Sequence, residues 1–66
     1  MPVQKILEWA DAHHRRTGRW PGVLSGEIPE APGEDWHAVN FALYRGFRGL
    51  PGGDSLAKLL ARERGR

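Results

Sequence analysis

Apolar side chains recur every three or four residues at the start of the chain. Val3, Ile6, Leu7 and Ala10 fall on one side of a helical wheel, and most of the charged residues fall on the other. Gly18 follows this pattern and suits the left-handed conformation that commonly ends a helix. The pattern predicts an amphipathic helix over about residues 3–17.

A second helical pattern covers about residues 34–45, with Trp36, Val39 and Leu43 on its inner stripe and Gly46 at its end. The face that points away from this stripe is polar and aromatic. It consists of His37, Asn40, Phe41 and Tyr44.

The third pattern covers about residues 55–64 and turns Leu56, Leu59 and Leu60 inward. We expect Asp54 to be the N-cap of this helix, because a carboxylate can accept hydrogen bonds from the free N–H groups of a first turn. Cationic residues spaced by four positions line its outer face: Lys58, Arg62 and Arg66.

Residues 18–33 separate the first two helices and are rich in proline and glycine. Such a composition rules out a long helix and argues against a central strand. Trp20, Val23, Leu24 and Ile28 are too apolar for a solvated linker, so we expect them to fold back over the helices. We therefore predict a long ordered loop.

Together these patterns predict an all-α fold, in which residues 1–66 form one compact three-helix module of helix-turn-helix-like layout. A chain of 66 residues buries only about 60% of its unfolded surface, and without cysteine it has no disulfide to support it. Three tryptophans must therefore supply much of the core. Because no apolar run approaches the roughly 20 residues of a membrane span and no signal-peptide pattern is present, we expect a cytoplasmic protein with no membrane partner.

The net charge of +2 hides an uneven distribution. Residues 21–35 carry only acidic charges, whereas basic residues outnumber acidic ones from residue 36 onward. Because clustered cations attract the phosphates of nucleic acids, our leading hypothesis is a nucleic-acid-binding module that favours double-stranded DNA. The third helix and the corner before it would make the contact. The alternative explanation of the same charges is a helix face that is simply exposed to solvent. The candidate binding residues are Arg45, Arg48, Lys58, Arg62 and Arg66 for phosphates, with Asn40 and Tyr44 for more specific contacts.

The corner before the third helix contains Pro51, Gly52 and Gly53. Consecutive glycines before a helix can expose N–H groups to an anion. Asp54 argues against this function, because its charge would repel a phosphate, and no Gly-Lys-Ser/Thr step follows. We predict a structural corner that bends the second helix into the third, although the connection is longer than a strict helix-turn-helix allows.

No catalytic, cofactor or metal site is predicted. Asp11, His13, His14 and His37 contain ligand atoms, but no two histidines are three or four positions apart, as a zinc site on one helix requires. We expect His13 and His14 to donate hydrogen bonds to loop carbonyls instead. No nucleophile stands beside an oriented base, and so small a domain can hardly enclose a substrate cavity. Neither an enzyme nor a small-molecule substrate is expected.

The segments ILEWADAHHRRTGRWP, PGEDWHAVNFAL and GFRGLPGGDSLAKLLARERG resemble one unit of a bacterial tandem-repeat family. The Trp-Pro step after the first helix and the later Trp are also distantly similar to helicase-associated and homing-endonuclease-associated repeats, which contact DNA. The first resemblance covers nearly the whole chain, brings no established activity and implies neighbouring units as partners. It implies a scaffold made of Trp9, His13, His14, Gly18, Trp20, Pro21, Trp36, Leu43, Gly46, Gly49, Leu50, Pro51, Gly52, Gly53 and Leu56. It further implies that the outer positions of the second helix vary between units, which suits either a recognition surface or neutral drift.

The alternative hypothesis is a protein-interaction or structural repeat unit. In this case Phe41, Tyr44 and Phe47 form an apolar contact patch, and packing against neighbouring units is the function. Self-association that depends on Phe41 would favour this alternative over DNA binding.

Overall fold

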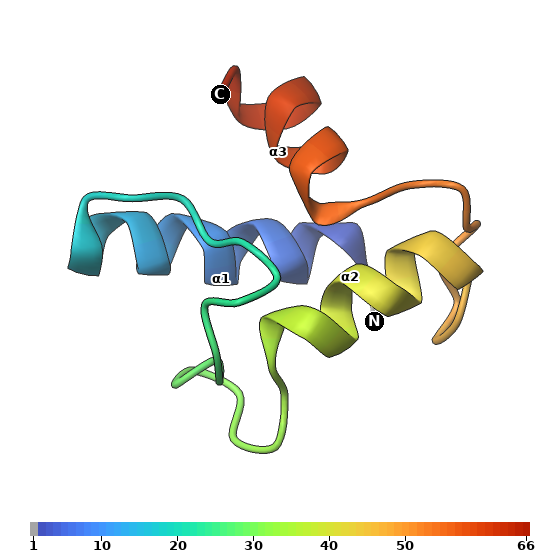
Figure 1. Ribbon diagram of the computed structural model, residues 1–66, viewed down its shortest axis with the longest axis horizontal. Helices are drawn as coiled ribbons and strands as arrows, with labels where there is room; N and C mark the ends of the chain where they lie inside the picture. Colours follow the sequence, from blue (N-terminus) through green and yellow to red (C-terminus); the bar gives the residue numbers. More distant parts are fainter. Residues whose placement is uncertain (1) are drawn as a thin grey trace.

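The computed structural model describes residues 2–66 and contains three helices, α1 (Val3–Thr17), α2 (Trp36–Arg45) and α3 (Leu56–Arg64). In Figure 1, α2 lies below α1 and α3 rises above it. The only β-type pairing in this part of the chain is an isolated bridge between Glu27 and Asp35. The predicted all-α, three-helix fold is confirmed. The predicted second and third helices begin one or two residues too early, because their first residues precede or form extended N-caps.

One apolar core lies between the three helices. The inner residues predicted for α2 and α3 are all buried, and Trp36 is only 1% exposed. Trp9 is also buried and Trp20 packs against the core, so the indole rings contribute as expected. The core consists of Ile6, Leu7, Trp9 and Ala10 from α1, Trp36, Val39, Ala42 and Leu43 from α2, Leu56, Leu59 and Leu60 from α3, and Ile28 and Leu50 from the connections.

The connection between α1 and α2 is ordered by its own hydrogen bonds. The Ile28 N–H donates to the Glu34 carbonyl at 3.0 Å, and the Trp36 N–H donates to the Gly26 carbonyl at 3.0 Å. Ile28 is buried as predicted. The prediction is wrong for Val23 and Leu24, which are 40% and 93% exposed.

A tight turn explains why Val23 and Leu24 point outward. The Gly22 N–H donates to Ser25 Oγ at 2.8 Å, and the Ser25 N–H donates back to the Gly22 carbonyl at 3.0 Å. These reciprocal bonds close residues 22–25 into a turn with Val23 and Leu24 at its tip. We call Val23, Leu24 and the nearby exposed Glu27 the loop tip.

The corner between α2 and α3 caps the end of α2. The Gly53 N–H donates to the Tyr44 carbonyl at 2.9 Å, and the Asp54 N–H donates to the Leu43 carbonyl at 3.2 Å. Carbonyls in the last turn of a helix have no partner within the helix, so the corner supplies them. The N–H groups of Gly53 and Asp54 are therefore engaged in the fold, which agrees with a structural corner rather than an anion cradle.

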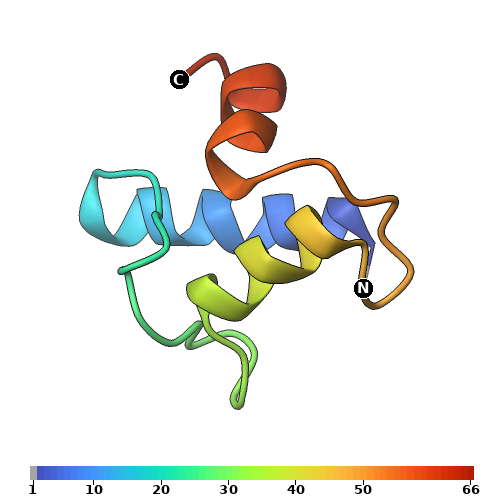
Figure 2. The ribbon, with the colours of Figure 1, turned by 45° about the vertical axis from the view of Figure 1, so that its right-hand side comes forward.

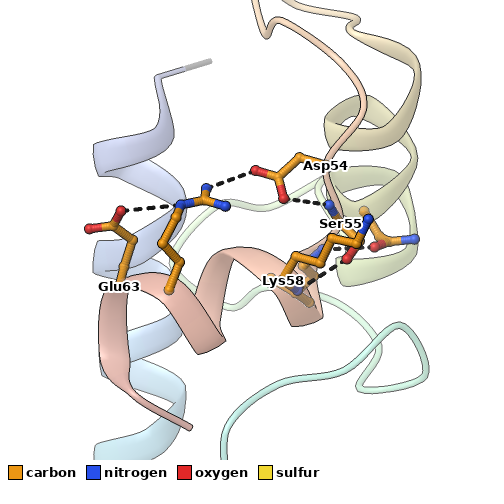
Figure 3. A network of polar contacts seen from close by, with 7 residues as sticks. Asp54, Ser55, Lys58 and Glu63 are labelled. Carbon is orange, nitrogen blue, oxygen red and sulfur yellow. Dashed lines mark hydrogen bonds and ion pairs between the residues drawn. The ribbon is translucent and has the colours of Figure 1, made fainter.

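The N-cap of α3 is Ser55, one residue later than predicted. Ser55 Oγ accepts a hydrogen bond from the Lys58 N–H at 3.1 Å. Asp54 lies outside the helix, where Oδ1 accepts from the Ser55 N–H at 2.8 Å and Oδ2 accepts from Arg62 at 2.9 Å (Figure 3). The prediction of Asp54 as N-cap is wrong because serine caps equally well and Asp54 is drawn to a guanidinium.

His13 and His14 contact indole rings rather than loop carbonyls. The His14 ring stacks on Trp20 with centroids 4.3 Å apart, and the His13 ring meets Trp36 edge-on at 6.1 Å. Neither imidazole donates a hydrogen bond to a loop carbonyl within residues 2–66, so that expectation is wrong. Both rings help to fasten the connection after α1 to the helix, because Trp20 and Trp36 flank that connection.

Candidate interaction surfaces

Four exposed side chains lie at the end of α2, and we call them the aromatic patch: Phe41, Tyr44, Arg45 and Phe47. The side chains of Phe41, Tyr44 and Phe47 are 45%, 62% and 47% exposed, respectively. The rings of Phe41 and Phe47 meet edge-on with centroids 5.5 Å apart. The Arg45 guanidinium carbon lies 5.8 Å from the Phe41 centroid and 5.9 Å from the Phe47 centroid, a distance typical of cation–π contacts.

The end of α2 places these side chains together. Phe41 and Arg45 are four residues apart and share a face of the helix opposite the buried stripe. Gly46 adopts a left-handed conformation, and the Phe47 N–H then donates to the Ala42 carbonyl at 3.1 Å. This C-terminal cap folds the chain back so that Phe47 lies against Phe41. The four-residue spacing of Phe41 and Arg45 is the signal in the sequence for this contact.

Two of the predicted phosphate ligands pair with carboxylates. Arg48 makes a bidentate contact with Glu34, of which the Nη1–Oε1 bond is 2.8 Å long. Arg62 binds Asp54 at 2.9 Å and lies 3.5 Å from Glu63. The hydrogen bonds from these arginines lower the pKa of Glu34 and of Asp54, and the Ser55 N–H also lowers the pKa of Asp54. Both guanidinium groups are therefore paired with carboxylates in the fold.

The remaining predicted cations, Arg45, Lys58 and Arg66, take part in no ion pair within residues 2–66. They come from three separate places: the last turn of α2, the first turn of α3 and the end of the chain. Because α3 ends at Arg64 and Gly65 is left-handed, Arg66 lies beyond the helical stripe on which it was placed.

The two residues predicted to make specific contacts differ in their surroundings. Tyr44 is well exposed and belongs to the aromatic patch. Asn40 is half-buried, and its Oδ1 accepts a hydrogen bond from the Leu56 N–H at 2.9 Å. Asn40 thereby joins α2 to the first turn of α3, and only its Nδ2 group remains to donate to another molecule.

Acidic residues of the middle segment pair with basic residues from other parts of the chain. Glu34 holds Arg48, and Glu30 binds Arg16 of α1 at 2.8 Å. Hydrogen bonds from the backbone of Glu30 itself and from Arg16 lower the pKa of Glu30. Glu27 is exposed and takes part in no ion pair within the described residues.

Residues 2–66 hold no cluster of three or more acidic or histidine side chains placed to bind a metal ion, and no pocket is found among them. None of the three helices within residues 2–66 has the length and hydropathy to cross a membrane.

No protein-family model, curated protein or solved structure matches this chain. The resemblances to tandem repeats and to DNA-contacting repeats therefore stay predictions.

Proposed function

We propose that this chain is a protein-interaction module that associates through the aromatic patch. The observation that supports the proposal is the exposed Phe41–Phe47 pair with Arg45 over both rings. Aromatic and arginine side chains dominate the energetics of protein interfaces, and an arginine beside exposed rings gives a partner both apolar area and a charge. No acidic residue of the described chain neutralises Arg45, so its charge is available to a partner.

Self-association gives the first test, because it needs no other partner. We expect NMR resonances of patch residues to shift between about 10 µM and about 1 mM protein, a range suited to an interface much smaller than the standard of about 1,600 Å². The Phe41→Asp variant should abolish these shifts, because it places a charge in the apolar contact. Gln4→Asp, an equal charge change at an exposed position of α1, is the matched control and should leave them intact.

Thermal unfolding of each variant shows whether it is folded, and Phe47→Asp provides a second patch variant outside the helix. Resonances that do not depend on concentration, or that shift equally in Phe41→Asp and wild type, would contradict the proposal.

Nucleic-acid binding is a second candidate function. It is supported by the unpaired cations Arg45, Lys58 and Arg66 and by the exposed Tyr44. Ion pairing of Arg48 and Arg62 weighs against it, because a phosphate must compete with Glu34 and Asp54 for these guanidinium groups.

The titration of labelled duplex DNA at several salt concentrations tests this second candidate. We expect Lys58→Ala and Arg66→Ala each to weaken binding and to make its salt dependence shallower by about one phosphate contact. Arg15→Ala, the loss of an exposed cation near the end of α1, is the matched control. The absence of binding at low salt, or an equal loss in the control, would eliminate the candidate.

A further inference from the structure

The loop tip is the second exposed apolar feature of the molecule. Leu24 is 93% exposed, more than any other large hydrophobic side chain among residues 2–66, and Val23 beside it is 40% exposed. The hydrogen bonds between Gly22 and Ser25 hold both residues in an ordered turn. Exposure of Leu24 on a preorganised turn does not stabilise the fold. A partner that covers this side chain would gain binding free energy from its burial.

The loop tip and the aromatic patch are complementary. The tip presents two aliphatic side chains and the carboxylate of Glu27, which forms no ion pair within residues 2–66. The patch presents two phenyl rings and the guanidinium of Arg45, which is likewise unpaired. The aliphatic groups of the tip can make apolar contacts with the rings of the patch, and the Glu27 carboxylate can form an ion pair with Arg45. The two features are therefore complementary in polarity and in charge.

The two features lie apart in one molecule. In Figure 2 the loop that carries the tip lies on the left, and the connection at the end of α2 lies on the right. No ring contact or ion pair joins them in the described part of the chain, and Leu24 at the tip is 93% exposed, so the patch does not cover it. A contact between a patch and a tip must therefore join two molecules.

We infer that the partner of the aromatic patch is the loop tip of a second copy of this chain, with Leu24 against Phe41 and Phe47 and Glu27 beside Arg45. This inference rests on the proposed function and names its partner. The contact is heterologous, since different surfaces of the two copies meet, and each added copy leaves a free tip and a free patch at the ends. Copies therefore associate head to tail, weakly as separate molecules and more strongly where they are linked and the effective concentration is high.

Complementation of two variants tests the inference. Leu24→Asp keeps the patch and loses the tip, whereas Phe41→Asp keeps the tip and loses the patch. We expect each variant alone to self-associate at least about tenfold more weakly than wild type, because each removes an apolar contact and buries a charge. A mixture of the two should form a 1:1 complex of about wild-type affinity, because one intact tip meets one intact patch. Isotope-labelled Leu24→Asp titrated with unlabelled Phe41→Asp should show shifts at residues 41–47.

Charge exchange tests the ionic part of the same contact. Glu27→Arg and Arg45→Glu should each weaken self-association when alone, and a mixture of the two variants should restore it. Since Leu24 is almost fully exposed, Leu24→Asp should unfold at the wild-type temperature, so its effect on association cannot come from misfolding.

The outcomes separate this inference from the proposed function. If Leu24→Asp associates as wild type does while Phe41→Asp does not, the patch meets another patch; the proposed function stands and the head-to-tail contact is refuted. If both variants fail and their mixture fails too, the contact is also refuted. If wild type shows no association that depends on Phe41, the proposed function itself is refuted.

Discussion

Gly46 and Gly18 occupy equivalent places, each just after a helix and each with φ near +80°. Their surroundings differ. A Cβ at Gly18 would meet nothing within 4 Å, whereas a Cβ at Gly46 would lie 3.1 Å from the Leu50 carbonyl oxygen and 3.2 Å from the Gly52 nitrogen. Gly46 is thus required both for its backbone conformation and for the close approach of two backbone segments.

We expect Gly46→Ala to lower the free energy of unfolding by about 2 kcal/mol and Gly18→Ala by about 1 kcal/mol. The difference measures the crowding at the corner, because the conformational cost is common to both positions. Urea denaturation of the two variants gives both values. Equal losses would show that the corner relaxes around the added methyl group.

His13 makes the stability of the fold depend on pH. Burial beside Trp36 lowers the pKa of His13 below its ordinary value of 6.5, and the nearby Arg16 lowers it further. The folded state therefore favours the neutral ring more than the unfolded state does. As pH falls below 6.5, the unfolded state takes up the proton first, and stability is lost until the pH reaches the lower pKa of the folded state.

The free energy of unfolding of the wild type should accordingly decrease from about pH 7.5 to about pH 5. This decrease should be smaller in His13→Gln, which cannot titrate, and should persist in His37→Gln, the matched change at an exposed histidine of α2. Denaturation curves at several pH values measure the effect. An unchanged pH dependence in His13→Gln would assign the effect to another group.

At the scale of the elements, one side chain joins α2 to α3. Asn40 Oδ1 accepts the Leu56 N–H, one of the first-turn donors that a helix cannot satisfy itself. Asn40→Ala should therefore lower the free energy of unfolding by about 1 kcal/mol. Asn40→Asp keeps the acceptor and adds a negative charge at the N-terminus of α3, so it should retain the wild-type stability.

Hydrogen exchange of the Leu56 amide gives the local readout for these variants. It should become faster in Asn40→Ala and stay slow in Asn40→Asp. Equal exchange in Asn40→Ala and wild type would mean that water replaces the amide oxygen at no cost.

The helices were predictable because their signals are local. Leucine and tryptophan spacing gave the buried faces of α2 and α3, and Gly18 and Gly46 marked the ends of α1 and α2. The loop tip was not predictable in this way. Its exposure depends on the reciprocal bonds of Gly22 and Ser25, and apolar composition alone suggested burial for Leu24.

The candidate surfaces were only partly predictable. Phe41 and Tyr44 could be proposed as part of a patch from their helical positions away from the buried stripe, and Phe47 from its place just after the helix end. The pairing of Arg48 with Glu34, fourteen residues away, could not be predicted. Only the fold brings the connection after α1 to the corner after α2. Charge counts along a sequence do not show which charges cancel in space.

Ion pairs connect parts of the chain that are far apart in the sequence. Arg64 of α3 makes a bidentate contact with Asp11 of α1, with bonds of 2.8 and 2.9 Å across fifty-three residues. Together with the pairs that Glu30 and Glu34 form, this pair cross-links distant segments in the folded state. Because both partners of this pair are partly exposed, its strength should decrease with added salt.

A double-mutant cycle with Asp11→Asn and Arg64→Met measures this cross-link. The hydrogen bond from Arg64 lowers the pKa of Asp11 below its ordinary value of 3.8, so the charged form is favoured in the folded state. The stabilisation is complete well above 3.8 and is lost as pH falls through the lower pKa of the folded protein. The cycle should therefore give a favourable coupling at about pH 6 that is lost as pH falls below 3.8 and Asp11 becomes protonated. A coupling that survives full protonation of Asp11 would assign the contact to packing of the arginine stem rather than to charge.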